Sequence, residues 1–301
     1  MIQSLKGQNL RIFTGNHCIA MSTNCVITMN VNTESAATKD DVGLADKPSP
    51  VSKAWSVRVD SLDVTDAGAL LTAIASLSPF HIYWDETVSN GDHSNQEPEG
   101  ATFSRGGDAF INDLTFTWND RENSVKNIQL TGTGAIAHEN VPEYEWTQVN
   151  SLTKGQFVRL FLTSGSETTP TKVLGGAKQL SMHVSLSLED ATSKDTTGDF
   201  VRQEPTSLSY DISTTALVRS GDTIDSSVGA KDLNDLETIY ENSVPVKWLI
   251  ANVSGDNNRT KGNTIASGQV VLTSLEITAQ VRTNAQYTAQ LQGYGPYTVG
   301  S

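Results

Sequence analysis

The chain has 301 residues and carries 21 Lys and Arg against 34 Asp and Glu, a formal net charge of −13. Because an acidic protein repels phosphate backbones, this balance argues against sequence-specific or tight binding of nucleic acid. No apolar run approaches the roughly 18 residues of a membrane span and the N-terminal segment lacks the apolar core of a signal peptide, so a soluble protein made in the cytoplasm is predicted.

The first half of the chain is predicted to form strands around a single helix. An opening strand covers residues 7–13, a polar loop covers residues 34–53, and a strand follows at residues 55–59. Between the first strand and the loop, apolar residues recur at every second position and are interleaved with Thr28 and Asn30, which predicts another strand with one face on a core. Its apolar face consists of Cys25, Ile27, Met29 and Val31.

Each half contains one predicted helix that is closed by a proline and followed by a strand. Thr65 or Asp66 can cap the first helix, and Asp232 can cap the second. The closing prolines and the strands after them are Pro79 with residues 80–84 and Pro245 with residues 246–250. The apolar stripes are Ala67, Leu70, Leu71, Ile74 and Leu77 in the first helix and Leu233, Leu236, Ile239 and Tyr240 in the second.

The second half repeats the order of the first. The opening Gly7-Gln8 returns as Gly155-Gln156, and the alternating strand returns at residues 180–188, followed by a strand at residues 208–212. Each half then closes with two long strands and a Leu-x-Gly-x-Gly motif at residues 130–134 and 291–295. The closing strands are residues 110–118 and 125–135 in the first half and 268–279 and 287–293 in the second.

This duplicated order predicts a mainly β protein with two tandem β-sandwich or barrel domains, each with one flanking α-helix. A half of about 150 residues is an ordinary domain size and can bury one core. The first domain is placed at residues 1–136 and the second at residues 153–301. Residues 137–152, which contain several glutamates and a proline, are interpreted as a polar linker.

The sequence offers no constellation for catalysis, and no enzyme, metal site or cofactor is predicted. Phosphate-binding, nucleophile-elbow and zinc motifs are absent, and the carboxylates lie mostly in loops. His17 and Cys18 are adjacent, so a strand would point them to opposite faces, which favours ordinary sheet residues over a metal site. Cys18 and Cys25 flank a predicted turn; two buried reduced thiols are favoured over a cross-strand disulfide.

Found twice, this order of motifs resembles the phage major tail tube family of long-tailed bacteriophages, with two tube domains in one chain. The resemblance rests on the Gly-Gln opening (Gly7, Gly155), the Lys-Asp loop after the second strand, the helix-then-strand step and the Leu-x-Gly-x-Gly ending. It covers nearly the whole chain, although residues 85–105 exceed the matching stretch of a minimal tube domain. It implies β domains arranged sixfold in rings that stack as a hollow conduit for genome ejection.

The resemblance also implies that the loop after the second strand of each domain, at residues 34–53 and 190–206, reaches the adjoining ring. The residues expected in these stacking loops are Thr38, Lys39, Asp40, Asp41, Ser193, Lys194 and Asp195. The polar faces of the two alternating strands carry no Lys or Arg and can line a wet lumen. The residues expected there are Thr28, Asn30, Asn32, Ser181, His183, Ser185 and Ser187.

The expected partners are further copies of the chain, the tape measure, terminator and distal tail proteins, and double-stranded DNA in transient passage. The expected location is the virion tail, after assembly in the bacterial host cytoplasm. Three chains with two domains each would restore sixfold pseudo-symmetry in a ring. Two alternatives stay open: the tube subunit of a contractile injection or secretion system, and a surface glycan-binding β-sandwich module.

Overall fold

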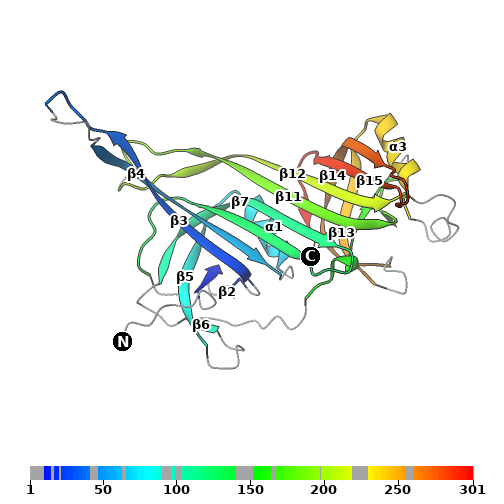
Figure 1. Cartoon of the computed structure of the whole chain (residues 1–301), viewed down its shortest axis with the longest axis horizontal. Coiled ribbons are helices and arrows are strands. Elements are labelled where there is room, and N and C mark those ends of the chain that lie inside the picture. Colours follow the sequence, from blue (N-terminus) through cyan, green and yellow to red (C-terminus); the bar gives the residue numbers. More distant parts are fainter. Residues whose placement is uncertain are drawn as a thin grey trace.

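The computed structural model describes most of the chain, and Figure 1 shows its large sheet with the helices α1 and α3. The described residues are 10–14, 17–19, 22–40, 47–62, 66–89, 96–98, 104–139, 152–163, 167–196, 198–218, 230–254 and 260–300. They are mainly β structure, as the sequence predicts, and contain the two α-helices α1 (Ala67–Ala75) and α3 (Leu233–Asn242). Within these ranges, no helix is long and apolar enough to cross a bilayer.

The strands pair antiparallel in one large sheet, apart from β6, which pairs with the end of β5. In the first half they are β1 (Leu10–Thr14), β2 (His17–Cys18), β3 (Ser22–Ser35), β4 (Pro48–Ser61), β5 (Phe80–Ser89), β6 (Gln96–Pro98), β7 (Arg105–Asn119) and β8 (Val125–Gly132). In the second half they are β9 (Val158–Leu162), β10 (Lys172–Val173), β11 (Ala177–Asp190), β12 (Gln203–Leu217), β13 (Val246–Ser254), β14 (Thr260–Thr278), β15 (Gln286–Gly293) and β16 (Thr298–Val299).

The two halves pair their strands in the same order. In the first half the order is β2-β1-β5-β7-β8-β4-β3, and in the second it is β10-β9-β13-β14-β15-β12-β11. Each central strand has a bulge at the same place, between Ile111 and Asp113 in β7 and between Leu272 and Ser274 in β14. Strand by strand, β3 is therefore equivalent to β11 and β7 to β14. These pairings fix which residues of the two halves are equivalent.

The Leu-x-Gly-x-Gly motif has a steric explanation that is the same in both halves. A Cβ on Gly132 would lie 2.1 Å from the Trp55 ring, and one on Gly293 would lie 2.6 Å from the ring of Tyr210, the equivalent residue. The last glycines, Gly134 and Gly295, have φ of 84° and 74°, which L side chains rarely adopt. The first glycine thus makes room for an aromatic ring on the neighbouring strand, and the second allows the chain to turn.

The structure corrects the predicted start of the second half. Residues 155–157 form a 3₁₀ turn, η2 (Gly155–Phe157), and the strand begins only at Val158. A Cβ on Gly155 would lie 2.3 Å from the Asn119 carbonyl oxygen. Gly155 is therefore required by close backbone contact with the end of β7, and its match with Gly7 lies outside the described residues.

Both helices begin beside a predicted cap residue, but Asp66 makes no side-chain capping hydrogen bond at α1, and the apolar stripes differ in detail. Asp232 caps α3 by accepting hydrogen bonds from the backbone amides of Asn234 and Asp235. Leu77, expected in the stripe of α1, lies beyond the helix in a left-handed conformation and is exposed. Tyr240 of α3 is also exposed, whereas Leu236 and Ile239 of the same helix are buried.

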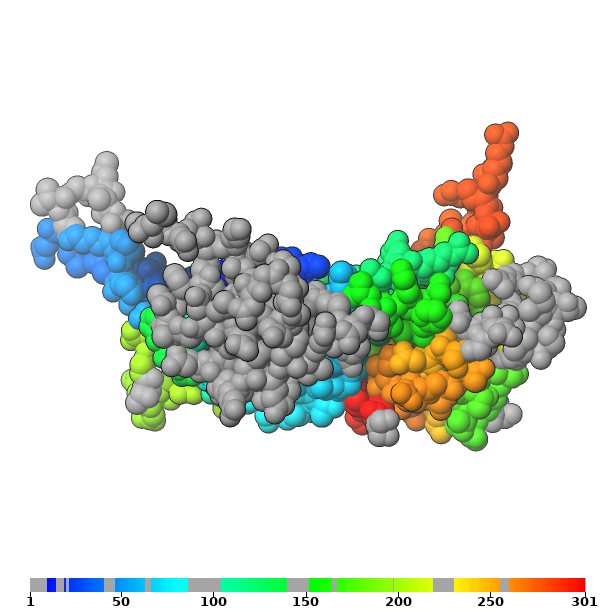
Figure 2. Space-filling model, turned by 90° about the horizontal axis from the view of Figure 1, so that it is seen from below, coloured from blue at the N-terminus to red at the C-terminus, as the bar shows by residue number. Residues whose placement is uncertain are grey.

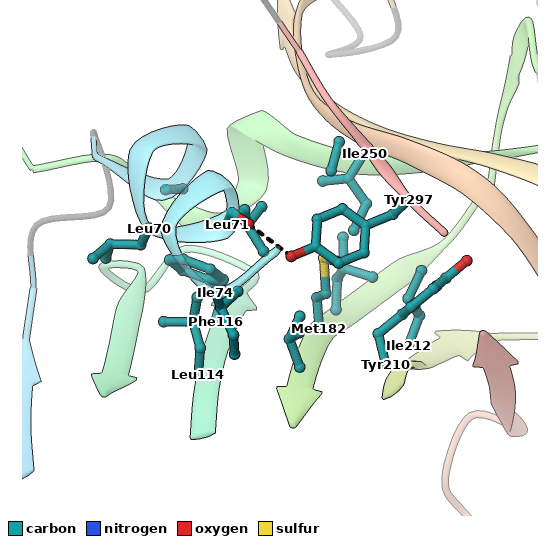
Figure 3. Close-up of a cluster of buried hydrophobic side chains, with 14 of the residues drawn as sticks. Leu70, Leu71, Ile74, Leu114, Phe116, Met182, Tyr210, Ile212, Ile250 and Tyr297 are labelled. Atoms are coloured by element: carbon teal, nitrogen blue, oxygen red, sulfur yellow. Dashed lines mark hydrogen bonds between the residues drawn. The ribbon is translucent and has the colours of Figure 1, made fainter. Parts of the chain in front are cut away.

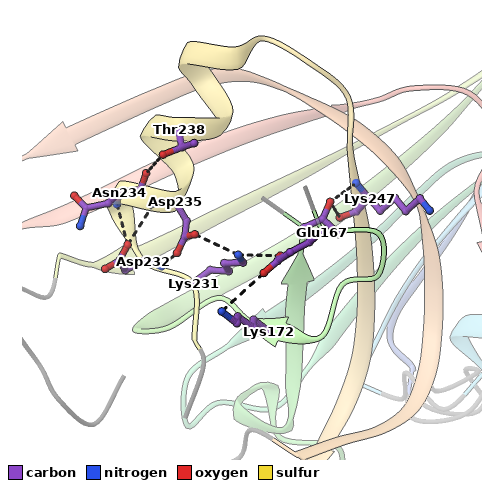
Figure 4. A network of polar contacts seen from close by, with 9 residues as sticks. Glu167, Lys172, Lys231, Asp232, Asn234, Asp235, Thr238 and Lys247 are labelled. Atoms are coloured by element: carbon purple, nitrogen blue, oxygen red, sulfur yellow. Dashed lines mark hydrogen bonds and ion pairs between the residues drawn. The ribbon is translucent and has the colours of Figure 1, made fainter. Parts of the chain in front are cut away.

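Two buried lysines are neutralised by carboxylates, one in each half. Lys126 on β8 has no exposed side-chain surface, and its Nζ lies 2.5 Å from both carboxylate oxygens of Asp66, the residue before α1. Lys231, before α3, lies 2.9 Å from Glu167 and 3.2 Å from Asp235 (Figure 4). Because an unpaired buried charge is costly, each pair fixes the start of its helix against the sheet.

Candidate assembly surface

The two halves are joined edge to edge, so that the sheet runs from one into the other. β11 pairs with the C-terminal part of β7 from Gln179–Asn119 to Ser185–Asp113, beyond the segment of β7 that pairs with β5. β11 thus pairs with the part of the β7 edge that β5 leaves unpaired. The result is one continuous wall in which a strand of the second half completes the sheet of the first, and we call this contact the internal joint.

The apolar side of the internal joint is fully packed. Met182 lies opposite Phe116 and Val184 lies opposite Leu114, and all four side chains are buried. Helix α1 covers this side, and Tyr297 of the second half donates a hydrogen bond of 2.7 Å from its hydroxyl to the Leu71 carbonyl of α1 (Figure 3). The helix of the first half is therefore held by residues of both halves.

The opposite side of the joint is polar and carries a histidine between two carboxylates. His183 on β11 lies with Nδ1 2.9 Å from Asp211 on β12 and with Nε2 2.8 Å from Asp113 on β7. These partners come from both neighbouring strands, one of them in the other half of the chain. Burial lowers the pKa of His183, but the hydrogen bonds and charges of Asp113 and Asp211 outweigh it and raise that pKa above its ordinary value.

Sheet pairing brings the polar residues expected to line a lumen onto one face of the wall. One row crosses seven strands through Asn24, Asp60, Asn127, Thr115, His183, Asp211 and Gln292. Ser181, Ser185 and Ser187 flank His183 on β11, and Thr28, Asn30 and Asn32 extend the same face along β3. The charged residues on or beside this row are Arg58, Asp60, Asp113, His183, Asp211 and Glu276, and Lys178 donates a 3.5 Å hydrogen bond to Gln286 at one end of the same face.

The residues expected in stacking loops lie at exposed turns. Thr38, Lys39 and Asp40 follow β3, and Ser193, Lys194 and Asp195 follow β11; Asp41 lies outside the described residues. Both hairpins extend toward the same end of the molecule (Figure 1). The second loop also returns onto the first half, where the Lys53 amide donates a 2.7 Å hydrogen bond to the Asp199 carbonyl.

The residues that complete the His183 cluster were missed from sequence. Asp113 and Asp211 lie on strands far from His183 along the chain, and only the register of the sheet brings them together. In the part of the chain that the structure describes, no group of three or more His, Cys, Asp or Glu could hold a metal ion. Cys25 is a free, half-buried thiol whose pKa is raised by burial, and the Cys18 side chain lies outside the described residues.

The linker expected at residues 137–152 is partly attached to the first half. Ala137 and Gly106 exchange two backbone hydrogen bonds of 2.9 Å. Glu139 lies 2.8 Å from Nε2 of His81, whose Nδ1 lies 2.7 Å from Asp108. Residues 140–151 lie outside the described residues.

No protein-family model and no curated protein sequence matches the chain. Among solved structures, it is similar to a chain in the tail of an empty gene transfer agent (GTA) particle refined with helical C6 symmetry, with 12% identity and a TM-score of 0.38 over 50% of this chain and 99% of that one. A chain in the virion of a native GTA particle is 14% identical, with a TM-score of 0.37 over 50% of this chain and 99% of that one. A chain of the SPP1 tail tube, solved by solid-state NMR and cryo-EM, is 18% identical, with a TM-score of 0.36 over 49% of this chain and 78% of that one.

Proposed function

We propose that this chain is a structural subunit of a bacteriophage tail tube, built from two copies of one tube domain. The observation that carries the proposal is the internal joint, in which two halves with the same strand order already form a continuous sheet. A protein that joins two copies of a domain edge to edge is suited to building a longer wall from further copies. The sequence resemblance to tail tube proteins, carried by motifs that occur twice, supports the same role.

The two faces of the wall suit a conduit. The apolar face is covered by α1 and packed side chains, while the polar face carries Ser, Thr, Asn and Gln around a mainly acidic centre. Four carboxylates lie there, against Arg58, Lys178 and the partly exposed His183. A face of this charge would repel DNA phosphates rather than hold them, so that a genome could slide past. We propose that this face lines the lumen.

Within this proposal, three chains form a ring with pseudo-sixfold symmetry, and rings stack through the loops after β3 and β11. Self-assembly, contact with other tail proteins and passage of double-stranded DNA follow from that arrangement, in a virion tail assembled in the host cytoplasm. The tube of a contractile injection system would use the same wall. The glycan-binding alternative gains no support, because no specific feature among the described residues of the polar face favours a sugar.

Electron microscopy of the purified protein at rising concentration tests the proposal. We expect rings and hollow tubes, and mass measurement of an isolated ring should give three chains. Shortening the loop after β3 should leave rings intact and stop their stacking. A monomer at every concentration would contradict the tube function, and a six-chain ring would contradict the trimer.

Assembled tubes also test the assignment of the lumen. We expect little retention of double-stranded DNA even at low salt, because the lumen face repels phosphates. Tight retention that weakens steeply as salt rises would show a basic lumen and overturn the assignment of the polar face.

A further inference from the structure

We propose that a second copy of this chain docks its β3 strand on the free edge of β14, in the register of the internal joint. The inference rests on the proposed tube function and deepens it, because it assigns the residues of the contact between subunits. The template is internal: β11 pairs with β7, β3 is the equivalent of β11, and β14 is the equivalent of β7. The equivalents are present in the chain but are not paired with each other.

The register of the new contact follows from the strand equivalence. In the internal joint Val184 lies opposite Leu114, Met182 opposite Phe116 and Leu180 opposite Trp118. The strand registers and the matching bulges give each of these residues an equivalent on β3 or at the C-terminal end of β14. The transferred pairs are Met29 with Leu275, Ile27 with Ile277, and Cys25 with Ala279 of the other copy.

Exposed apolar side chains mark both edges. Met29 and Ile277 are 52% and 50% exposed, whereas their equivalents Val184 and Phe116 are each 0% exposed. The sequence thus keeps apolar residues at positions that are buried only where a partner strand is present. An exposed edge strand with apolar side chains can pair with another strand, because its outward backbone N–H and C=O groups have no strand partner.

Among the described residues, none covers the helix of the second half as Tyr297 covers α1. Ile74 of α1, beside the contact with Tyr297, is 1% exposed, and its equivalent on α3, Tyr240, is 60% exposed. Helix α1 contacts β14 and β16 of the other half. By the same relation, the second copy should bring Ile136, the equivalent of Tyr297, onto Tyr240 of α3.

A cavity beside Tyr294 and Gly295 marks a third point of contact. In the first half, Arg202 lies 3.4 Å from where a Cβ of Gly134 would be, and the Gly134 amide donates to the Val201 carbonyl. Around the equivalent Gly295 nothing among the described residues lies within 4 Å of such a Cβ, and a cavity of about 620 Å³ opens there. The equivalent of Arg202 is Lys47, just before β4, which should enter this cavity from the second copy.

The two edges lie at opposite ends of the molecule. Figure 2 shows the hairpin of β3 and β4, in blue, projecting from one end and the end of β14, in orange-red, projecting from the other. Pairing them joins chains head to tail. Such a contact uses two different surfaces, so it repeats until a ring closes.

The native thiol of Cys25 allows a cross-linking test of this register. Cys18→Ser first removes the other cysteine, so that Cys25 is the one native thiol left. Ala279→Cys should form a disulfide with Cys25 of the neighbouring copy under mild oxidation, giving covalent multimers on non-reducing gels. The matched control is Gln280→Cys, which adds the same thiol at the next residue along the chain. We expect about tenfold less cross-linking in the control, because a disulfide needs Cβ atoms about 3.5–4.5 Å apart.

A pair of aspartate variants tests the contact without a cross-link. Ile277→Asp should abolish assembly and leave the monomer folded, whereas Val244→Asp, at a residue of similar exposure outside the contact, should assemble normally. Normal assembly of Ile277→Asp would overturn the proposal.

Failure of the register and failure of the tube function give different results. Tubes of Ala279→Cys that do not cross-link would refute the register and leave the tube function standing. Cross-linked open chains without rings or tubes would support the contact and refute the tube function. A monomer at all concentrations would refute both.

Discussion

Strands β11 and β3 hold equivalent places in the two halves of the chain. Among the described strands, β11 is paired on both edges, whereas β3 is an open strand, paired on one edge. β11 lies between β12 and β7, and its apolar residues from Leu180 to Leu186 are buried. β3 pairs only with β4 among the described strands, and its Met29 and Val31 are more than half exposed. The comparison teaches that both strands carry the apolar pattern of a core strand, and that the partner on the second side decides whether the pattern is satisfied.

The largest expected difference comes from the same substitution at equivalent positions. Val184→Asp places a charge in the fully buried apolar side of the internal joint and should lower the free energy of unfolding by about 3–5 kcal/mol. Met29→Asp, on the open strand, should change it by less than about 0.5 kcal/mol in the monomer. Urea unfolding at low protein concentration measures both. Equal losses would mean that β3 is already covered in the monomer.

The aspartates before the two helices should also respond differently. Asp66→Ala removes the partner of Lys126, which is fully buried, and should cost about 3 kcal/mol. Asp232→Ala removes a helix cap and should cost about 1 kcal/mol.

Thermal unfolding of the two single variants checks the order of these losses. The double variant Asp66→Ala with Lys126→Met should recover most of the first loss, because no unpaired charge stays buried. A double variant as unstable as Asp66→Ala would show that the loss has another origin.

A smaller effect is expected where the second half holds α1. Tyr297→Phe removes a buried hydrogen bond to the Leu71 carbonyl and should cost about 1 kcal/mol. Tyr240→Phe, on the exposed helix of the other half, should have no measurable effect on the monomer. Chemical denaturation of the two variants provides the comparison, and a loss confined to Tyr240→Phe would reverse the assignment of the covered and uncovered helices.

The smallest effect should be a dependence of the internal joint on pH. The pKa of His183 is raised in the folded chain from 6.5, so its stabilising contribution is fully present below that pH and is lost as the pH rises through the raised value. Because His183 is partly exposed, we expect the loss to be under about 1 kcal/mol. The open strand has Thr28 at the equivalent position, so its edge should show no such dependence.

Urea unfolding on both sides of neutrality measures this effect, with His183→Gln as the control. The variant should lose the pH-dependent part of the stability in this range. A wild-type protein that gains stability as the pH rises there would contradict the sign of the effect.

The sequence by itself determined the local structure and its repetition. Alternation predicted β11 and β3, Asp232 and Pro245 marked the ends of the helix-to-strand step, and the repeated Leu-x-Gly-x-Gly motif marked the matching end of each half. These features depend on contacts within a few residues or on backbone geometry, which short segments encode. The motif even has the same steric cause in both halves, although the aromatic ring that requires its first glycine could not be identified from sequence.

The tertiary structure alone decided which faces are covered. Alternation showed that Val184 and Met29 belong to apolar strand faces, but not that one meets Leu114 and the other meets solvent. The carboxylates around His183 likewise come from strands that the chain brings together only through sheet register. Pairing between distant strands depends on the whole set of competing edges, so local sequence cannot specify it. For this reason the elements could be predicted, whereas the joint between the halves and the open edges had to be observed.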